Sequence, residues 1–216
     1  MKRVGVAALL AALSVVGVVP ASVAQMAKEQ SWTAYDTGSS GFNIAVAIGA
    51  QFKAKLGSDV RILPSGNDTG RLGPVRAGRA VISQMGIGVY FAQEGVFEFG
   101  TKSWGPQPVR LMMTATSCNG LGLAVARDTG VKEVKDIRGK RVGVVVGSPA
   151  LTQGVLALIA FAGLTEKDVK LVEFSSNNAM WKGIISNEAD VALTSTISGQ
   201  SKEADTSPRG IVFPPM

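Results

Sequence analysis

The sequence contains no histidine and only one cysteine, Cys118, among its 216 residues. Histidine is the commonest general base and the commonest metal ligand, so Ser-His-Asp and Cys-His catalysis and His-based zinc sites are excluded. A single cysteine cannot form an internal disulfide, and a lone thiol in an oxidising compartment is usually buried and unreactive. We therefore expect a protein that is not an enzyme, with no catalytic residue, no cofactor and no metal.

Dense runs of positive charge are also missing. The chain has 22 Lys and Arg against 16 Asp and Glu, a formal net charge of +6, but the basic residues are scattered along it. A protein that follows a nucleic-acid backbone concentrates its basic residues on one surface. We therefore expect no nucleic-acid partner.

The N-terminus has the pattern of a secretory signal peptide. Lys2 and Arg3 form a positive start, and Val4–Val19 is an uncharged apolar run. Ser22-Val23-Ala24 then offers the small residues that a cleavage site requires. We expect residues 1–24 to be removed and the mature protein to be exported to the periplasm; an uncleaved membrane anchor is the alternative. Loss of the two basic residues would lower the formal charge from +6 to +4.

Strand-like and helix-like segments alternate along the rest of the chain. Hydrophobic residues make up 46 % of the sequence, enough for a core, and its 26 glycines indicate many turns. We predict strands at residues 32–37, 59–63, 80–87, 109–114, 121–126, 142–146, 169–174 and 190–194. We predict helices at residues 42–56, 71–77, 89–99, 152–163 and 177–187, and the sequence turns polar after Ser195. Such alternation predicts an α/β fold with mostly parallel sheets flanked by helices.

One uncharged stretch, Val142–Thr165, could be mistaken for a membrane span. Gly147-Ser148-Pro149 divides it into a short strand and a helix. The helix is too short to cross a hydrocarbon core of ~30 Å, so we do not expect it to span a membrane.

The turn around Gly38 joins a strand to a helix and is the most informative short segment. The helix carries Ile44, Ile48 and Phe52 at a spacing of four, which places them on one face. Ser39 or Ser40 is placed to cap the helix. Unpaired N–H groups at a helix start favour an anion, although an ordinary strand-to-helix turn explains the pattern equally well.

An ordered series of motifs resembles a known family. The series is Thr37–Phe42, Leu63–Gly66, Ile137–Val142, Ala162–Leu164 before Asp168-Val169, and Gly183–Ala192. It is similar to the TAXI family, the extracytoplasmic solute receptors of TRAP transporters. No single motif is specific, but their order is. The similarity runs from about Trp32 to the end of the sequence.

The resemblance implies a two-lobed fold like that of the type II periplasmic binding proteins. Lobe 1 would span residues 25–116 and lobe 2 residues 117–216, with a hinge at 115–122. Such a receptor closes on a small organic anion, a carboxylate or an amino acid, and delivers it to TRAP-type permease subunits in the membrane. We expect it to act as a monomer.

Two departures from the family pattern stand out. Ser40-Gly41-Phe42-Asn43 replaces a segment in which many members carry tyrosines, so an aromatic hydroxyl near the ligand is missing. Family members are also longer, so the resemblance implies that the second lobe is incomplete. We then expect the isolated chain to fold poorly, because missing strands leave sheet edges and apolar faces uncovered.

The candidate ligand-binding residues lie at the turns that follow predicted strands. They are Gly38, Ser39, Ser40, Gly41, Phe42, Ser65, Asn67, Thr69, Arg71, Tyr90, Ser148, Thr152, Asn177 and Asn178. Arg71 could bind a carboxylate through two hydrogen bonds, or be an ordinary surface arginine. The serines, Thr152 and the asparagines could instead only cap helices, and Tyr90 could pack in the core.

One alternative function remains at this point. A periplasmic enzyme could use Ser39 or Ser40 as a nucleophile on a small anion. Without histidine its base would have to be a lysine or a carboxylate such as the neighbouring Asp36.

Overall fold

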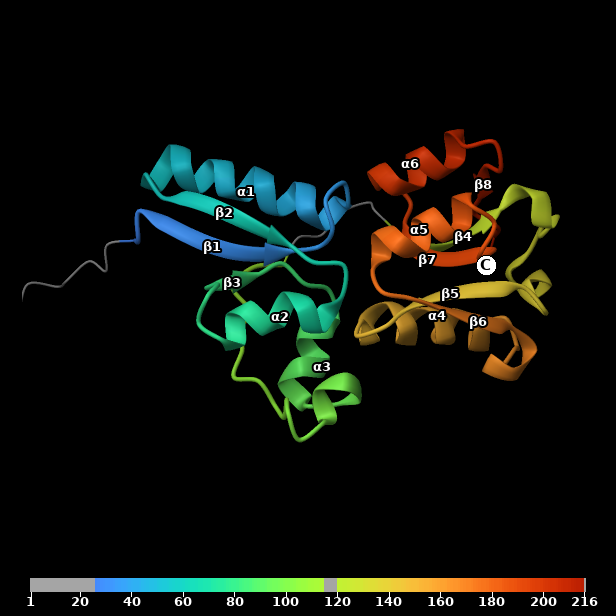
Figure 1. Ribbon diagram of the computed structural model, residues 1–216, viewed down its shortest axis with the longest axis horizontal. Coiled ribbons are helices and arrows are strands. Elements are labelled where there is room, and N and C mark those ends of the chain that lie inside the picture. The colour runs from blue at the N-terminus through green and yellow to red at the C-terminus, as the bar shows by residue number, and fades with distance from the viewer. Residues whose placement is uncertain (1–25, 115–119, 216) are drawn as a thin grey trace, which may run out of the picture.

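The computed structural model describes residues 26–114 and 120–215. They form two α/β lobes that lie end to end (Figure 1). The predicted signal peptide and most of the predicted hinge lie outside the described residues, as does the boundary between residues 116 and 117. The described chain contains no helix that is both long and apolar enough to cross a membrane.

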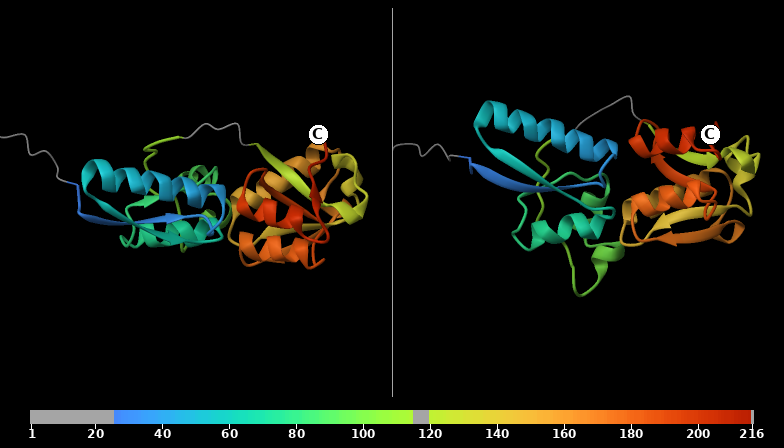
Figure 2. Two further views of the ribbon diagram at one scale, coloured as in Figure 1. Left: turned by 90° about the horizontal axis from the view of Figure 1, so that it is seen from above. Right: turned by 45° about the horizontal axis from the view of Figure 1, so that its top comes forward.

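Lobe 1 is built on a three-stranded parallel sheet with the order β2-β1-β3. Its elements are β1 (Glu29–Ala34), α1 (Ser40–Leu56), β2 (Asp59–Pro64), α2 (Asp68–Arg76), β3 (Ile82–Ser83), α3 (Gly88–Glu94) and a 3₁₀ turn at Phe97–Gly100. Helix α1 covers one face of the sheet, and α2 and α3 lie on the other (Figures 1 and 2). The ring of Trp32 on β1 packs edge-on against Phe52 of α1, with 4.8 Å between centroids.

Lobe 2 is built on a five-stranded mixed sheet with the order β6-β5-β7-β4-β8. Its strands are β4 (Leu121–Ala126), β5 (Arg141–Val145), β6 (Lys170–Phe174), β7 (Val191–Ser195) and β8 (Ile211–Val212). Its helices are α4 (Pro149–Phe161), α5 (Asn177–Ile185) and α6 (Gly199–Thr206), with 3₁₀ turns at Arg127–Thr129, Val134–Ile137 and Glu166–Asp168. Strands β6, β5 and β7 are parallel, whereas β4 is antiparallel to both β7 and β8.

The core of lobe 2 follows from the alternation of side chains along β5. Val142 and Val144 point to the face that α4 covers, where they meet Val155 and Ile159. Val145 points to the opposite face and packs with residues of α5 and α6, including Met180 and Ala204. The continuous apolar run of β5 is therefore that of a strand with both faces buried. The apolar stretch that resembled a membrane span is thus β5 and α4, as predicted.

Several predicted elements differ from those observed. The predicted strand at 80–87 is reduced to β3, and the predicted helix at 89–99 ends at Gly95, whose φ of +65° is left-handed. Residues 109–114 form no strand. No strand in the described part of the chain pairs with them, and Leu111, Met112 and Met113 are 72 %, 75 % and 60 % exposed. Helix α6 and strand β8 were not predicted, because the segment after Ser195 is polar.

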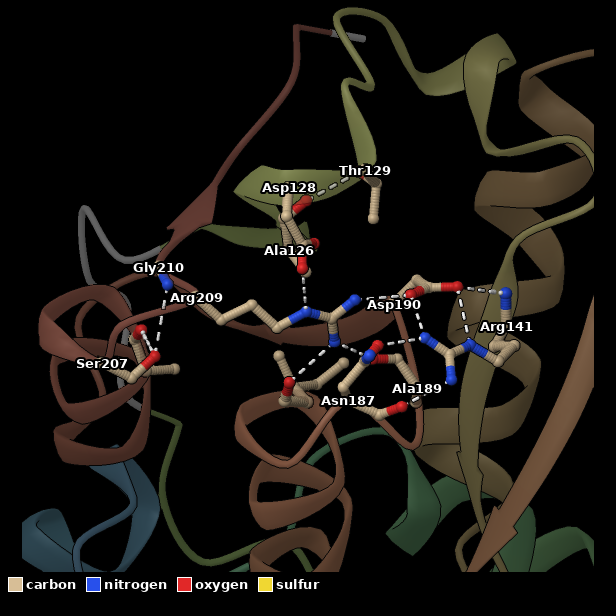
Figure 3. A network of polar contacts seen from close by, with 12 residues as sticks. Ala126, Asp128, Thr129, Arg141, Asn187, Ala189, Asp190, Ser207, Arg209 and Gly210 are labelled. Carbon is tan, nitrogen blue, oxygen red and sulfur yellow. Dashed lines mark hydrogen bonds and ion pairs between the residues drawn. The ribbon is translucent and has the colours of Figure 1, made fainter.

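Two arginines and two aspartates form a network of hydrogen bonds and ion pairs in lobe 2, at the end of the sheet where β5 and β7 begin (Figure 3). Asp190 accepts hydrogen bonds from Arg141 Nη2 and Arg209 Nη2, both at 2.7 Å. Arg209 also donates to Asp128 Oδ2 at 2.8 Å and to the carbonyl oxygens of Ile184 and Ala189. The motifs at 137–142 and 183–192 therefore meet in one network of hydrogen bonds and ion pairs.

Candidate functional site

The predicted site residues gather where the two lobes meet. The parallel strands of lobe 1 point towards lobe 2, and the turns that follow β1 and β2 lie against the first turns of α4, α5 and α6 (Figures 1 and 2). Ligands of open α/β sheets bind at such carboxyl ends of strands. The boundary between the lobes is therefore the candidate site.

The first turn of α4 is bound to a carboxylate from lobe 1. Asp68 Oδ2 accepts from the backbone N–H of Ala150 at 2.8 Å and from Ser148 Oγ at 3.2 Å. Thr69 N–H donates to the carbonyl oxygen of Gly147 at 3.1 Å. Ser148 is the N-cap residue of α4, as predicted, but its hydroxyl makes no capping bond and is directed to lobe 1 instead.

Arg71 compensates the charge of Asp68 from within lobe 1. The two side chains are fully buried and form an ion pair three residues apart on α2. Arg71 Nη1 also donates to the carbonyl oxygen of Ser65 at 3.0 Å, and its guanidinium lies 3.6 Å from the centroid of the Tyr35 ring. Desolvation raises the pKa of Tyr35; the charge of Arg71 lowers it, and that of Asp68 raises it. Arg71 is therefore neither a surface arginine nor an unpaired cation.

The first turn of α5 is bound to a second carboxylate. Asp36 Oδ2 accepts from the backbone N–H of Asn178 at 2.9 Å. Next to it, Asn177 N–H donates to the carbonyl oxygen of Gly66 at 3.2 Å. Ser176 caps α5 by accepting from Ala179 N–H, so the cap is not one of the two asparagines. Each of these helices thus uses backbone donors in its first turn to hold an aspartate of lobe 1.

The turn at Gly38 contacts the start of α6. Gly199 N–H donates to the carbonyl oxygen of Gly38 at 3.0 Å. Gln200 Nε2 donates to Asn178 Oδ1 at 2.8 Å and to the carbonyl oxygen of Thr37 at 3.4 Å. Gly38 has a φ of +88°, a left-handed conformation that a glycine adopts at little cost.

The remaining predicted residues have capping, packing or exposed positions. Ser39 caps α1 through a 3.1 Å bond from Phe42 N–H, and Asn67 caps α2 through a 2.7 Å bond from Gly70 N–H. Ser40, Thr152 and Ser65 are partly buried, Gly41 is buried against Tyr35 and Gln84, and Tyr90 is exposed on α3. Since the hydroxyl of Ser39 is a helix cap, the geometry does not favour a nucleophilic serine there. The ligand contacts of these residues remain predictions.

The charge at the lobe boundary differs from the sequence-based expectation. The sequence indicated that Arg71 could bind a carboxylate and that a helix start would favour an anion. Asp68 neutralises Arg71, and Asp36 adds a second carboxylate. The sequence analysis did not identify Asp68 or Gln200, although an aspartate and an arginine three apart at a helix start are a recognisable pair. Among the residues with described positions, no cluster of Cys, Asp and Glu could hold a metal ion.

Comparisons with known proteins identify the fold class. The structure is similar to that of the alkanesulfonate-binding protein SsuA from Xanthomonas axonopodis pv. citri bound to MOPS, with a TM-score of 0.59 and 14 % identity. The alignment covers 87 % of this chain and 60 % of that one. A periplasmic binding protein from Brucella ovis with glutathione bound has a TM-score of 0.57 and 14 % sequence identity. The alignment covers 88 % of this chain and 59 % of that one. The chain thus has the two-lobed α/β fold of periplasmic binding proteins. It spans about three fifths of the length of the two proteins named above.

An ancestral arginine-binding protein bound to arginine is covered more completely. It has a TM-score of 0.53 and 18 % identity, and the alignment covers 88 % of this chain and 82 % of that one. No curated protein matches the sequence. Residues 43–213 match the NMT1/THI5-like family, and the chain belongs to this family. The more specific TAXI assignment remains a resemblance.

Proposed function

We propose that the protein is an extracytoplasmic solute-binding protein that captures a small organic anion, a carboxylate or an amino acid, between its lobes. One observation carries this proposal. The backbone N–H groups of Ala150 and Asn178, in the first turns of α4 and α5, both face lobe 1 and both hold a carboxylate there. Helix starts bind carboxylates through unpaired donors and the helix dipole.

In the structure the two lobes are in contact, and these carboxylates belong to Asp36 and Asp68. We call this arrangement closed. When the lobes separate, the same N–H groups become available to a carboxylate or a sulfonate from solution. Such an anion would then replace an internal partner rather than enter an empty site. The ligand affinity is accordingly reduced by the free energy needed to separate the lobes.

The proposed partner is a membrane permease. We further propose that this permease is of the TRAP type. The resemblance to the TAXI family favours a TRAP-type permease driven by an ion gradient. The similar protein from Brucella ovis is described as belonging to an ABC transporter, which is driven by ATP. Solute uptake by cells that carry the protein and its permease separates the two: a TRAP system stops when the ion gradient is collapsed, whereas an ABC system continues while ATP is present.

A thermal-shift screen against small carboxylates, sulfonates and amino acids tests the proposed function. A ligand of the folded state raises its stability by RT ln(1 + [L]/Kd), about 2.7 kcal/mol at a hundredfold excess over Kd. We expect at least one anion to raise the unfolding temperature, and its uncharged amide or ester to leave it unchanged. If no anion in the panel does so, the proposal is wrong.

A further inference from the structure

The chain leaves lobe 1 through a segment that has no partner in the described structure. Residues 105–114 form no helix, strand or turn. No backbone hydrogen bond joins residues 110–114 to any other described segment, and Leu111, Met112 and Met113 are exposed. Such a stretch opens locally at little cost in free energy, and exposed stretches of this kind are preferred sites of proteolytic cleavage.

The part of this segment that is held by lobe 1 ends just before Arg110. Gln107 is buried, and its backbone N–H donates to the carbonyl oxygen of Ala92 at 2.8 Å. Its side-chain Nε2 donates to two further carbonyl oxygens of the same loop. Val109 packs against the apolar cluster of lobe 1. Contacts with lobe 1 therefore hold the chain up to Val109, and Arg110 is the first residue beyond them.

Arg110 is the kind of residue that a trypsin-like protease recognises. It is exposed and forms no ion pair with any described residue. Its guanidinium donates to the carbonyl oxygen of the adjacent Val109 at 3.1 Å. Trypsin binds the basic side chain before the scissile bond against a carboxylate in its specificity pocket. The Arg110–Leu111 bond thus joins an exposed basic residue to an exposed apolar one.

Two other basic residues of lobe 1 lie in turns that are closed by hydrogen bonds. The backbone N–H groups of Arg79 and Ala80 both donate to the carbonyl oxygen of Pro74, at 2.8 and 3.1 Å. Lys102 lies in a turn in which the carbonyl oxygen of Thr101 accepts two backbone N–H groups. A protease binds its substrate in an extended form, so cleavage at either turn requires these bonds to break first.

The contact between the lobes is polar. The bonds of Asp36 with Asn178 and of Asp68 with Ala150 cross it. Each of the three hydrophobic clusters in the described chain lies within one lobe, whereas stable interfaces between separate chains have an apolar core. Within residues 26–215 the chain passes once from lobe 1 to lobe 2. This link keeps each lobe at a roughly millimolar effective concentration around the other.

We propose that the Arg110–Leu111 bond is a specific cleavage site for a protease of trypsin-like specificity, and that cleavage releases lobe 1 from lobe 2. The protease adds one water across the peptide bond, so that Arg110 gains a carboxylate and Leu111 becomes a new amino terminus. The cut is an irreversible way to separate the lobes. This inference goes beyond the proposed function, because it concerns the link between the lobes and requires no ligand.

Limited digestion of the full chain with trypsin tests the site, and intact-mass spectrometry of early samples identifies the first cut. We expect it after Arg110, at least about tenfold faster than at the next bond, which corresponds to about 1.4 kcal/mol less opening free energy. Arg110→Gln should abolish this cut, whereas Lys102→Gln, at an exposed lysine of a preceding turn, should retain it. Leu111→Pro keeps the arginine but should also block the cut, because proline fixes the backbone and lacks an N–H.

Size-exclusion chromatography of the digest tests the release. At a protein concentration of roughly 1 µM we expect the two fragments to elute apart, because the polar contact then acts without the link. The Arg110→Gln protein after the same treatment should elute as the uncut parent does. The proposal is overturned if another bond is cut first, if Arg110→Gln is cut as fast as the parent, or if the two fragments still elute together.

Discussion

Asp36 of lobe 1 accepts a hydrogen bond from the backbone N–H of Asn178 of lobe 2, with 2.9 Å between Oδ2 and N. The bond joins residues 142 positions apart in the sequence. With Asp68 and Ala150 it forms a pair of carboxylate-to-helix contacts that hold the lobes together. A charge-assisted bond of this kind is roughly twice as strong as a neutral one.

Replacing the carboxylate of Asp36 by an amide should shift the lobes towards an open arrangement. Asp36→Asn keeps the size of the side chain but removes a negative charge that faces α5, and it leaves the buried ion pair of Asp68 with Arg71 intact. We expect a larger radius of gyration in small-angle X-ray scattering. Asp59→Asn, which removes an exposed ion pair with Lys53, is the matched control and should leave the radius unchanged. An equal radius in all three proteins would mean that the carboxylate of Asp36 does not hold the lobes.

Loss of Arg71 should destabilise lobe 1 rather than merely alter its surface. Arg71→Ala leaves the buried carboxylate of Asp68 without its ion-pair partner. Removing one member of a buried pair costs ~3–5 kcal/mol. Denaturant unfolding measures the loss, and Arg138→Ala, in a largely exposed pair with Asp168, should cost less than about 1 kcal/mol. Equal effects of the two variants would contradict the buried pair.

Acid should weaken lobe 2 through Asp190. Desolvation pushes the pKa of Asp190 up, but hydrogen bonds from Arg141 and Arg209 outweigh it and hold the pKa well below its usual range. The unfolded chain therefore binds more protons, and the contribution of Asp190 is complete above a pH of about 4 and is lost as the pH falls towards the native pKa. Asp190→Asn should therefore reduce the loss of unfolding temperature on acidification. Asp205→Asn, in an exposed pair with Arg127, should lose unfolding temperature on acidification as the parent protein does.

A methyl group at Gly66 should disturb the contact between the lobes. A Cβ there would collide with Ser176 and lie 2.6 Å from Asp36 Oδ2. Gly66→Ala should therefore increase the radius of gyration by displacing α5. Gly73→Ala is the control, because a Cβ at that position meets no atom within 4 Å beyond its chain neighbours and the backbone of its own helix, and alanine favours a helix. A compact Gly66→Ala protein would show that α5 does not pack against this turn.

Local features of the fold could be predicted from the sequence, and long-range ones could not. The cap at Ser39 and the strand and helix on either side of Ser148 depend on a few neighbouring residues, and these predictions are confirmed. The strand expected at 109–114 is wrong, because an apolar run becomes a strand only where another strand pairs with it. Helix α6 packs through few apolar residues, so its polar sequence gave no periodic signal.

The candidate site shows the same limit. The turns that meet at the lobe boundary were identified, because strand ends in α/β folds carry the ligand site. Which groups face each other across the boundary depends on how two separately folded lobes meet. The contact of Asp68 with α4 was overlooked for this reason. Its ion pair with Arg71 was also missed, although the two residues are only three positions apart.

Calorimetric titration with the anion that gives the largest thermal shift tests the central claim most directly. The protein is compared with Ser148→Ala, which removes a hydroxyl that faces lobe 1, and with Ser186→Ala, which removes an exposed hydroxyl at the far end of α5. We predict saturable binding of one anion per chain, weakened about tenfold in Ser148→Ala and unchanged in Ser186→Ala. Equal binding by all three proteins, or no heat of binding at all, would contradict an anion site between the lobes.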